Sequence, residues 1–276
     1  MHGQLCYRGA TLRGASHLAL RAPRQDAFSF RFSDAGDWLA VCVADGVSQS
    51  PASHTAADLA CRKLTGALAT SLDGSPVPAT FEDWEQLADA VDWTGAAESA
   101  TAAIIDAATG LANPADGAEP GDGGDSLTPS AAAAIMATTA VCLVIATRAN
   151  ADGALPYSVA IVAGDSPAML LSEGEWSALT ELKDTDQEIA SSAVHPLPRQ
   201  PFIQPLLGAL ESGQALVLMT DGLGDPLGSG AGQVGSFLAE RWQEPPDTLS
   251  FLIDLGFLRK TFVDDRTAFA VWSLAG

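Results

Sequence analysis

Apolar runs that end in polar turns predict the first strands of this chain. Residues 38–44 form a continuous apolar run that leads directly into Asp45 and Gly46. A short run of this kind, bounded by a turn signal, is typical of a buried strand. Residues 27–32 alternate apolar and polar side chains, which is the period of a half-buried strand. Residues 27–44 are therefore predicted to form a β-hairpin, and Gly46 permits a close approach of the backbone to a ligand.

The same pattern recurs in the second half of the chain. Residues 215–220 are mostly apolar and again lead into an aspartate and a glycine, Asp221 and Gly222. At the N-terminus, residues 4–20 have mixed polarity and predict a strand with a turn around Gly14. Further strands are predicted at residues 138–147, 157–163, 169–172 and 267–272, with turns at 163–166 and 173–175.

Helical periodicity appears in two separate blocks. The first block covers residues 53–72, where Ser53 is the expected capping residue, and residues 81–109, with a break near 93–95. The second block covers residues 234–243 and 248–258. Strands surround each block, which favours an α+β fold of antiparallel sheets with helices packed outside over a βαβ alternation. Residues 1–276 are expected to form a single domain.

Two segments have the composition of loops. Residues 111–130 are rich in glycine, proline and aspartate and predict a surface loop. The carboxylates in this loop resemble a calcium-binding loop only loosely, because their spacing fits no EF-hand; they are Asp116, Glu119, Asp122 and Asp125. Residues 183–205 have little periodicity and several prolines, which predicts an irregular loop.

Composition narrows the possible partners and the compartment. Hydrophobic residues make up 47% of the 276 residues, enough for a well-filled core. The formal net charge of −20 should repel nucleic acid and anionic membranes, although acidic surfaces also keep proteins soluble. The cysteines show no CxxC spacing and are expected to be reduced, mostly as core residues: Cys6, Cys42, Cys61 and Cys142. With no secretory segment and no apolar run of membrane-spanning length, a cytoplasmic monomer is expected.

Carboxylates at the ends of apolar strands are the candidate chemistry. Four positions share this placement: Asp26, Asp45, Asp221 and Asp264. One such carboxylate is usually solvated or caps a turn, but four that converge repel one another unless cations neutralise them. Oxygen ligands without clustered histidine or cysteine favour Mg²⁺ or Mn²⁺ over zinc. Two such ions about 3.5–4 Å apart would activate water for attack on a phosphoryl group.

A set of short motifs, in order along the chain, resembles the metal-dependent protein phosphatase family, the type 2C serine/threonine phosphatases. The matching segments are Arg21, residues 25–27, 43–47, 137–139, 163–166, 219–223 and 264–267. The resemblance spans nearly the whole chain. It implies an α/β/β/α sandwich of two antiparallel sheets flanked by helices. It also implies metal-dependent hydrolysis of phosphoserine and phosphothreonine in proteins, and a role in signalling.

The resemblance assigns a role to each carboxylate. Asp45 would bridge two Mg²⁺ or Mn²⁺ ions and thereby take part in catalysis, and the Gly46 carbonyl would complete one coordination sphere. Asp221 and Asp264 would bind one ion. Asp26 would act through ordered waters on the other ion.

The resemblance also assigns a phosphate-binding residue. Arg21, five residues before Asp26, matches the arginine that clamps the substrate phosphate, a task that suits the planar guanidinium. Arg24 is the competing choice, and either could be an ordinary surface arginine. Asp165 and Ser166 match a Gly-Asp-Ser turn whose role is more often structural, although it can lie near a third metal.

Three features depart from the family pattern. Residues 47–51 replace the glycines that often follow Ala-Asp-Gly, and residues 131–136 contain no acid where a third-metal carboxylate usually lies. We therefore expect two ions, with a third absent or weakly held. Asp265 and Arg266 stand where Asn and an apolar residue are usual. No histidine matches a general-acid motif; His17 is the nearest candidate, and a structural role is the more common one for such residues.

Two alternatives to a protein phosphatase stay open from the sequence. One is a phosphatase-like regulatory binding module without turnover, and the other is a hydrolase of small phosphoesters. The presence of all four carboxylates favours catalysis. Competing motifs are missing, because the chain has no GxSxG, HExxH or P-loop sequence. Residues 173–205 occupy the place of the family's flap, so substrate specificity is predicted to reside there.

Overall fold

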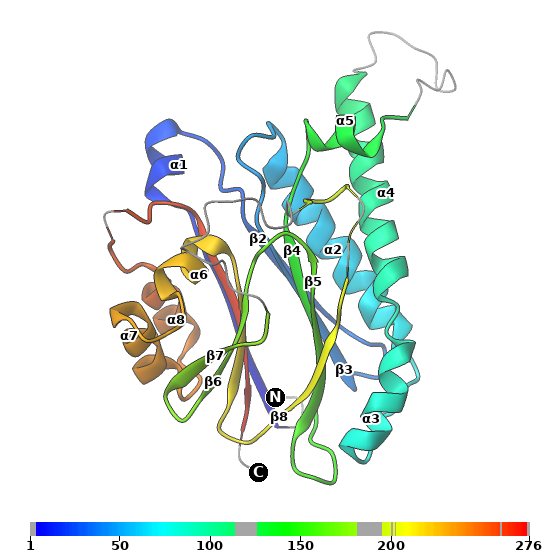
Figure 1. Cartoon of the computed structure of the whole chain (residues 1–276), viewed down its shortest axis with the longest axis vertical. Coiled ribbons are helices and arrows are strands. Elements are labelled where there is room, and N and C mark those ends of the chain that lie inside the picture. Colours follow the sequence, from blue (N-terminus) through cyan, green and yellow to red (C-terminus); the bar gives the residue numbers. More distant parts are fainter. Residues whose placement is uncertain are drawn as a thin grey trace.

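Two antiparallel sheets stack face to face, and helices cover both outer faces (Figure 1). The structure is a computed structural model that describes residues 4–113, 126–180, 195–199, 201, 203–259 and 261–274. Each sheet has five strands. The predicted α+β class and the α/β/β/α sandwich are therefore confirmed.

The chain passes several times from one sheet to the other, and consecutive strands often lie in the same sheet. The first half contains β1 Leu5–Leu12, α1 Ala15–Leu20, β2 Ala27–Phe32, β3 Trp38–Ala44, α2 Ser53–Ser71, α3 Phe81–Leu87, the 3₁₀ helix η1 Ala88–Ala90, α4 Trp93–Ala112, α5 Pro129–Ala133 and β4 Ala140–Ala146. The second half contains β5 Leu155–Ala163, β6 Ala168–Ser172, β7 Glu175–Ala178, β8 Leu206–Leu210, β9 Ala215–Met219, α6 Asp221–Leu227, α7 Gln233–Trp242, α8 Thr248–Leu255 and β10 Arg266–Ser273.

Strand pairing within each sheet is antiparallel throughout the described residues. The first sheet has the order β1-β10-β9-β6-β7 and the second has the order β2-β3-β4-β5-β8. The predicted hairpin over residues 27–44 is confirmed, with Ala27 opposite Ala44 and Phe32 opposite Leu39. In an antiparallel pair, the start of the first strand lies beside the end of the second. The start of β2 and the end of β3 therefore bring Asp26 and Asp45 to the same end of the pair.

Strand β3 shows how the layers pack. All seven of its residues are buried, because its two faces contact different layers. Leu39, Val41 and Val43 face the first sheet and join the apolar layer between the sheets. The small side chains Ala40 and Cys42 face the helices, so α2 can approach the sheet closely.

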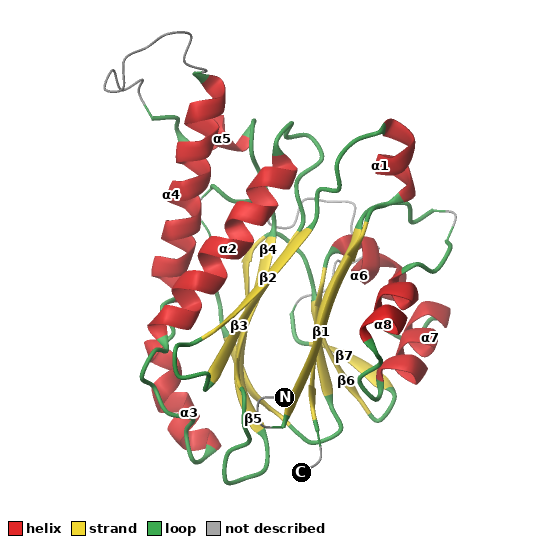
Figure 2. Cartoon of the chain, turned by 180° about the vertical axis from the view of Figure 1, so that it is seen from behind, coloured by secondary structure: helices red, strands yellow, loops and turns green. Residues whose placement is uncertain are grey.

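Helices α2 and α4 cover the second sheet, whereas α7 and α8 cover the first, as the rear view shows (Figure 2). Trp38 of β3 stacks on Trp84 of α3, with ring centroids 4.9 Å apart. The Trp84 indole Nε1 donates to the Tyr157 carbonyl at 2.9 Å. This bond satisfies the one polar atom of a fully buried side chain.

Several local predictions differ from the structure. Ser53 is the first residue of α2 rather than its cap; Ala52 occupies that position, and its amide donates to Ile135 O. The helical break comes slightly earlier than predicted, and Asp92 caps α4 with its carboxylate. The turn predicted around Gly14 leads into α1, and the turn predicted at residues 173–175 joins β6 to β7 as a hairpin. The sequence patterns did not indicate α5, α6 or β8.

Further expectations have mixed outcomes. The cysteines are unpaired, and three of them are fully buried: Cys42, Cys61 and Cys142. The loosely calcium-like carboxylates Asp116, Glu119, Asp122 and Asp125 lie outside the described residues. Across the described ranges, no helix combines the length and the apolar character that crossing a membrane would require.

Candidate metal centre

Four strand ends meet at one end of the sandwich, near α1 and α6 (Figure 1). Asp26 directly precedes β2 and Asp45 directly follows β3, and these strands are paired. Asp221 opens α6 just after β9, and Asp264 lies shortly before β10, which pairs with β9. The two sheets thus each contribute two of the predicted carboxylates.

The carboxyl groups of Asp26 and Asp45 both have raised pKa values. Burial raises the pKa of Asp45 well above its usual value, and the charge of Asp26 raises it further. The charges of Asp221 and Asp264 act on Asp45 in the same direction. Asp26 is only 3% exposed, and its pKa is raised to about 7, chiefly by burial. The structure therefore brings all four predicted carboxylates into one electrostatic cluster.

This cluster has the properties of a site for hard divalent cations. Its donors are carboxylate oxygens, which Mg²⁺ and Mn²⁺ prefer. The dominant influences on Asp45 are burial and like charges, so its ionised form lacks a compensating positive charge. Bound cations would remove that penalty, and the residues present therefore fit the expected metal ions.

Main-chain hydrogen bonds hold Asp45 from both sides. The Asp45 amide donates to Thr139 Oγ1 at 3.0 Å, and the Thr138 hydroxyl donates to the Asp45 carbonyl at 2.8 Å. The Thr139 hydroxyl also lies 2.8 Å from Ser166 Oγ, in the predicted Gly-Asp-Ser turn. Three of the motifs recognised in the sequence are thus a single support for the loop that carries Asp45 and Gly46.

Thr220 positions Asp26, a role that the sequence did not reveal. Its buried hydroxyl donates to Asp26 Oδ2 at 2.8 Å and accepts from the Thr267 amide at 3.0 Å. One side chain thereby links Asp26 to both β9 and β10. The only available signal was a polar residue at the buried end of an apolar strand, directly before Asp221.

Asp265 fastens the N-terminal segment to the start of β10. Its carboxylate is 2% exposed and accepts from the amides of Gly14 and Gln25, both at 2.6 Å. His17 Nδ1 lies 2.9 Å from Asp265 Oδ2 without the alignment of a hydrogen bond, so the two buried side chains form a close polar contact. Asp265, which stands where the family usually has Asn, thus has His17 as a close neighbour.

Two glycines allow the loops to reach the backbone of residues 264 and 265. A Cβ on Gly222 would lie 1.9 Å from the Asp265 carbonyl oxygen, and a Cβ on Gly14 would lie 2.3 Å from the Asp264 carbonyl carbon. Any larger residue at either position would displace the segment that carries Asp264. Close backbone approach therefore explains both glycines.

His17, Asp264 and Asp265 also bring ligand-type atoms within 4.8 Å of one another. His17 Nδ1 is 3.9 Å from Asp264 Oδ1, farther than its contact with Asp265. Because both Asp265 oxygens already accept amide hydrogens, we interpret this group as support for the cluster of four carboxylates and not as a separate metal site.

The two candidate arginines lie in different surroundings. Arg21 ends α1 in a left-handed conformation with φ 55° and is exposed. Among the described residues, no hydrogen bond or ion pair joins its side chain to the carboxylates, so its phosphate-binding role stays a prediction. The Arg24 Nε donates to the Asp26 carbonyl at 2.8 Å.

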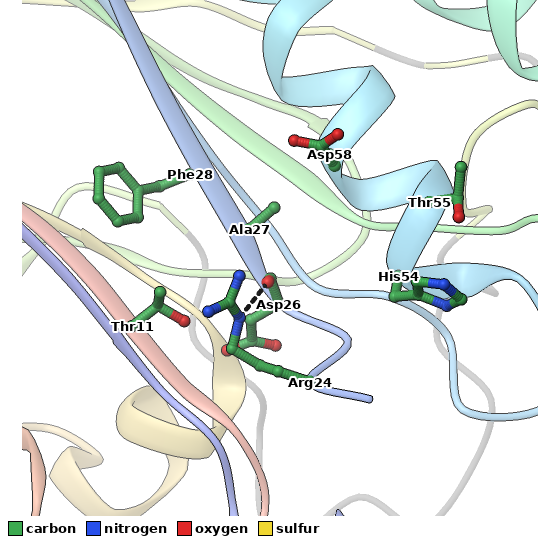
Figure 3. Close-up of a pocket in the computed structure, with 8 residues that line it drawn as sticks. All are labelled: Thr11, Arg24, Asp26, Ala27, Phe28, His54, Thr55 and Asp58. Carbon is green, nitrogen blue, oxygen red and sulfur yellow. Dashed lines mark hydrogen bonds between the residues drawn. The ribbon is translucent and has the colours of Figure 1, made fainter. Parts of the chain in front are cut away.

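Arg24 also lines a pocket next to Asp26, here named the Arg24 pocket (Figure 3). Its volume is about 320 Å³, and its lining residues are Thr11, Arg24, Asp26, Ala27, Phe28, His54, Thr55 and Asp58. They come from β1, from the start of β2 and from the first turns of α2. Asp26 belongs both to this pocket and to the carboxylate cluster.

One residue of the predicted flap, Leu197, is bonded to the segment that supports Asp45. Leu197 pairs with Thr138 through two main-chain hydrogen bonds of 2.9 and 3.2 Å. Residues 181–194 lie outside the described part of the chain. The specificity role predicted for residues 173–205 stays a prediction.

One comparison with known proteins identifies a family. The sequence profile described as Protein phosphatase 2C matches residues 13–248. Asp264 lies beyond that match. A search of curated proteins finds no match.

Solved structures match the fold along nearly the entire chain. A serine/threonine phosphatase of S. agalactiae is 16% identical, with a TM-score of 0.62, covering 97% of this chain and 99% of that one. PppA of Pseudomonas aeruginosa, a regulatory component of T6SS, is 20% identical, with a TM-score of 0.59 and 99% coverage of both chains. The catalytic domain of the phosphatase PstP, in complex with 2 manganese ions, is 19% identical, with a TM-score of 0.57 and coverage of 98% and 99%.

Proposed function

The chain belongs to the protein phosphatase 2C family, and from this premise we propose that it hydrolyses phosphoserine and phosphothreonine in proteins with two Mg²⁺ or Mn²⁺ ions. The observation that carries the proposal is the cluster of four carboxylates around Asp45, whose pKa is raised by burial and by the three neighbouring carboxylates. Such a cluster is poorly suited to a metal-free protein. We treat residues 1–276 as one catalytic domain that acts as a monomer in the cytoplasm.

Each side chain of the cluster has a proposed task. Asp45 and the Gly46 carbonyl would hold the ions, with Asp221 and Asp264 as further carboxylate ligands. Asp26 would act on an ion through ordered water. Two solved relatives support this assignment only by their fold, and the manganese ions of PstP motivate the choice of metal.

The chemistry divides between the metals and the chain. When bound, the ions would lower the pKa of a water molecule and offset the charge on the phosphoryl oxygens. Arg21 binds the phosphate from outside, because a guanidinium can donate two parallel hydrogen bonds to it. Thr220 keeps Asp26 in position through its 2.8 Å hydrogen bond, and the threonines at 138 and 139 hold the loop of Asp45.

Turnover of p-nitrophenyl phosphate with and without manganese tests the proposal. We expect manganese-dependent hydrolysis by the wild-type protein and at least a roughly 100-fold loss in Asp45→Asn and Asp221→Asn, since each removes a metal ligand. Phosphoserine and phosphothreonine peptides should be better substrates than nucleotides or sugar phosphates.

Asp152→Asn is the matched control. This exposed carboxylate lies in the β4–β5 turn, at the opposite end of the strands, where it contacts Asn150. The activity of this variant should equal that of the wild type. Hydrolysis that is absent in the wild type, or that persists in both cluster variants, would show that the metal-dependent phosphatase assignment is wrong. Manganese binding without turnover would indicate a regulatory module.

A further inference from the structure

The Arg24 pocket adjoins the proposed catalytic centre without being part of it. Asp26 is shared, whereas Thr11, Phe28 and His54 have no place among the metal ligands. A volume of about 320 Å³ is near the lower end of small-ligand sites, which span about 300–1,000 Å³. The pocket is therefore large enough for a side chain or two of a bound peptide.

Arg24 is held in position to act in this pocket. Its Nε donates to the Asp26 carbonyl at 2.8 Å, the bond drawn as a dashed line in Figure 3. The other two guanidinium nitrogens have no hydrogen bond or ion pair among the described residues. A guanidinium fixed at Nε loses less conformational entropy when its remaining N–H groups bind a ligand.

The remaining lining favours an anion. Figure 3 shows the Arg24 guanidinium beside Thr11, with His54 and Asp58 on the α2 side. His54 and the hydroxyls of Thr11 and Thr55 can donate hydrogen bonds. Two lining carboxylates, Asp26 and Asp58, oppose an anion. The Asp26 carboxylate accepts the Thr220 hydroxyl at 2.8 Å, and the Asp58 carboxylate pairs with the guanidinium of Arg62 at 2.7 Å.

Positive charge is scarce in this chain, which has 14 basic residues against 34 acidic ones. An arginine held beside the proposed catalytic centre is therefore a local exception to the acidic composition. A surface with net charge −20 would otherwise repel an acidic substrate. Local attraction at Arg24 would select which acidic segments approach the centre.

We propose that the Arg24 pocket is a substrate subsite that takes an anionic side chain, Asp, Glu or a second phosphorylated residue, close in sequence to the phosphoresidue being hydrolysed. The proposal rests on the proposed phosphatase function. Because Asp26 lines both sites, an extended peptide that advances about 3.3 Å per residue reaches the pocket within a few residues of the phosphate. This assigns Arg24 to a neighbouring side chain and leaves the phosphate itself to Arg21.

Matched phosphothreonine peptides test the subsite. One peptide has alanine at all flanking positions, a second set has a single glutamate at each of three positions on either side, and a third set has phosphoserine there. We expect kcat/KM to be about tenfold higher for at least one acidic position than for the alanine peptide, mainly through KM, as expected for one charge-assisted contact. The glutamate and phosphoserine sets separate the two kinds of anion.

Three variants locate the effect. In Arg24→Gln, the acidic-to-neutral ratio of kcat/KM should fall about tenfold, and Arg24→Lys should keep part of it because the charge is retained. Asp58→Asn should raise the ratio. Arg31→Gln removes an exposed arginine farther along β2 and serves as the charge-matched control, with an unchanged ratio.

The outcomes distinguish this proposal from the proposed function. If the wild type does not hydrolyse p-nitrophenyl phosphate with manganese, the phosphatase assignment fails. If it does so but treats acidic and neutral peptides alike, only the subsite is wrong. An Arg24→Gln variant that loses p-nitrophenyl phosphate turnover as strongly as acidic-peptide turnover would place Arg24 on the phosphate, and would also overturn the subsite.

Discussion

Replacing Asp26 with asparagine should stabilise the metal-free protein while impairing the metal centre. Asp26 is almost completely buried, and its pKa is raised to about 7, first by burial and also by the charge of Asp265. Above that pH the folded protein holds an ionised carboxylate at a cost. An asparagine side chain at this position would carry no charge, could accept the Thr220 hydroxyl in place of the Asp26 Oδ2 atom, and could donate to Asp45.

The pKa displacement sets the size of the effect. A carboxyl whose pKa moves from 3.8 to about 7 loses about 4 kcal/mol of folding free energy once both states are ionised. Between pH 4 and pH 7 the folded state binds more protons at Asp26 than the unfolded state does. Stability from this group is therefore present at low pH and is lost as pH rises. From pH 5 to pH 8 the advantage of Asp26→Asn should grow by about 3 kcal/mol.

Urea unfolding in EDTA at pH 5 and pH 8 measures this difference. We expect Asp26→Asn to be more stable than the wild type at pH 8, with a smaller or no advantage at pH 5. Saturating manganese should reverse the order, because a ligand that binds only the folded state stabilises it, and the wild type binds more tightly. A variant that is less stable than the wild type at both pH values in EDTA would refute the electrostatic reasoning.

Three further variants probe the supports of the cluster and of the core. Asp265→Ala should lower the unfolding free energy by about 3–5 kcal/mol in urea, because the buried Gly14 amide and the half-buried Gln25 amide lose their charged acceptor and His17 loses its close neighbour; Asp265→Asn should cost less, and equal costs would contradict the idea. Gly222→Ala should abolish the manganese-induced rise in Tm, since its Cβ would lie 1.9 Å from the Asp265 carbonyl oxygen, whereas Gly232→Ala meets nothing within 4 Å and should keep the rise. Trp84→Phe should cost about 1–3 kcal/mol by removing the buried hydrogen bond from the indole to the Tyr157 carbonyl, and an unchanged Tm would argue against that bond.

The convergence of the four carboxylates was predictable because these residues stand at strand ends. Hydrophobic runs locate such ends well, and Asp45 and Asp221 each follow one directly. The supporting contacts were not predictable. Thr220 reaches Asp26 across a sequence separation of 194 residues, and Asp265 reaches Gly14 across 251. Neither pair leaves a local pattern.

The local errors have similar causes. Ser53 has the residue type of a helix cap, but the Ala52 amide is bonded to Ile135 O, which sets where α2 begins. Strand β8 shows no alternation of apolar and polar residues in its sequence. Its pairing with β5 and its single buried residue, Leu210, are what identify it as a strand. In both cases tertiary contacts outweighed local propensity.

The sequence by itself determined the layered fold and the four strand-end carboxylates, because the period of apolar residues decides which elements form and which faces are buried. Tertiary structure decided everything that depends on distance: the burial that raises the pKa of Asp26, the pairing of His17 with Asp265, and the pocket that joins Arg24 to α2. Burial and electrostatic coupling depend on how close residues lie in space, which spacing along the chain does not encode.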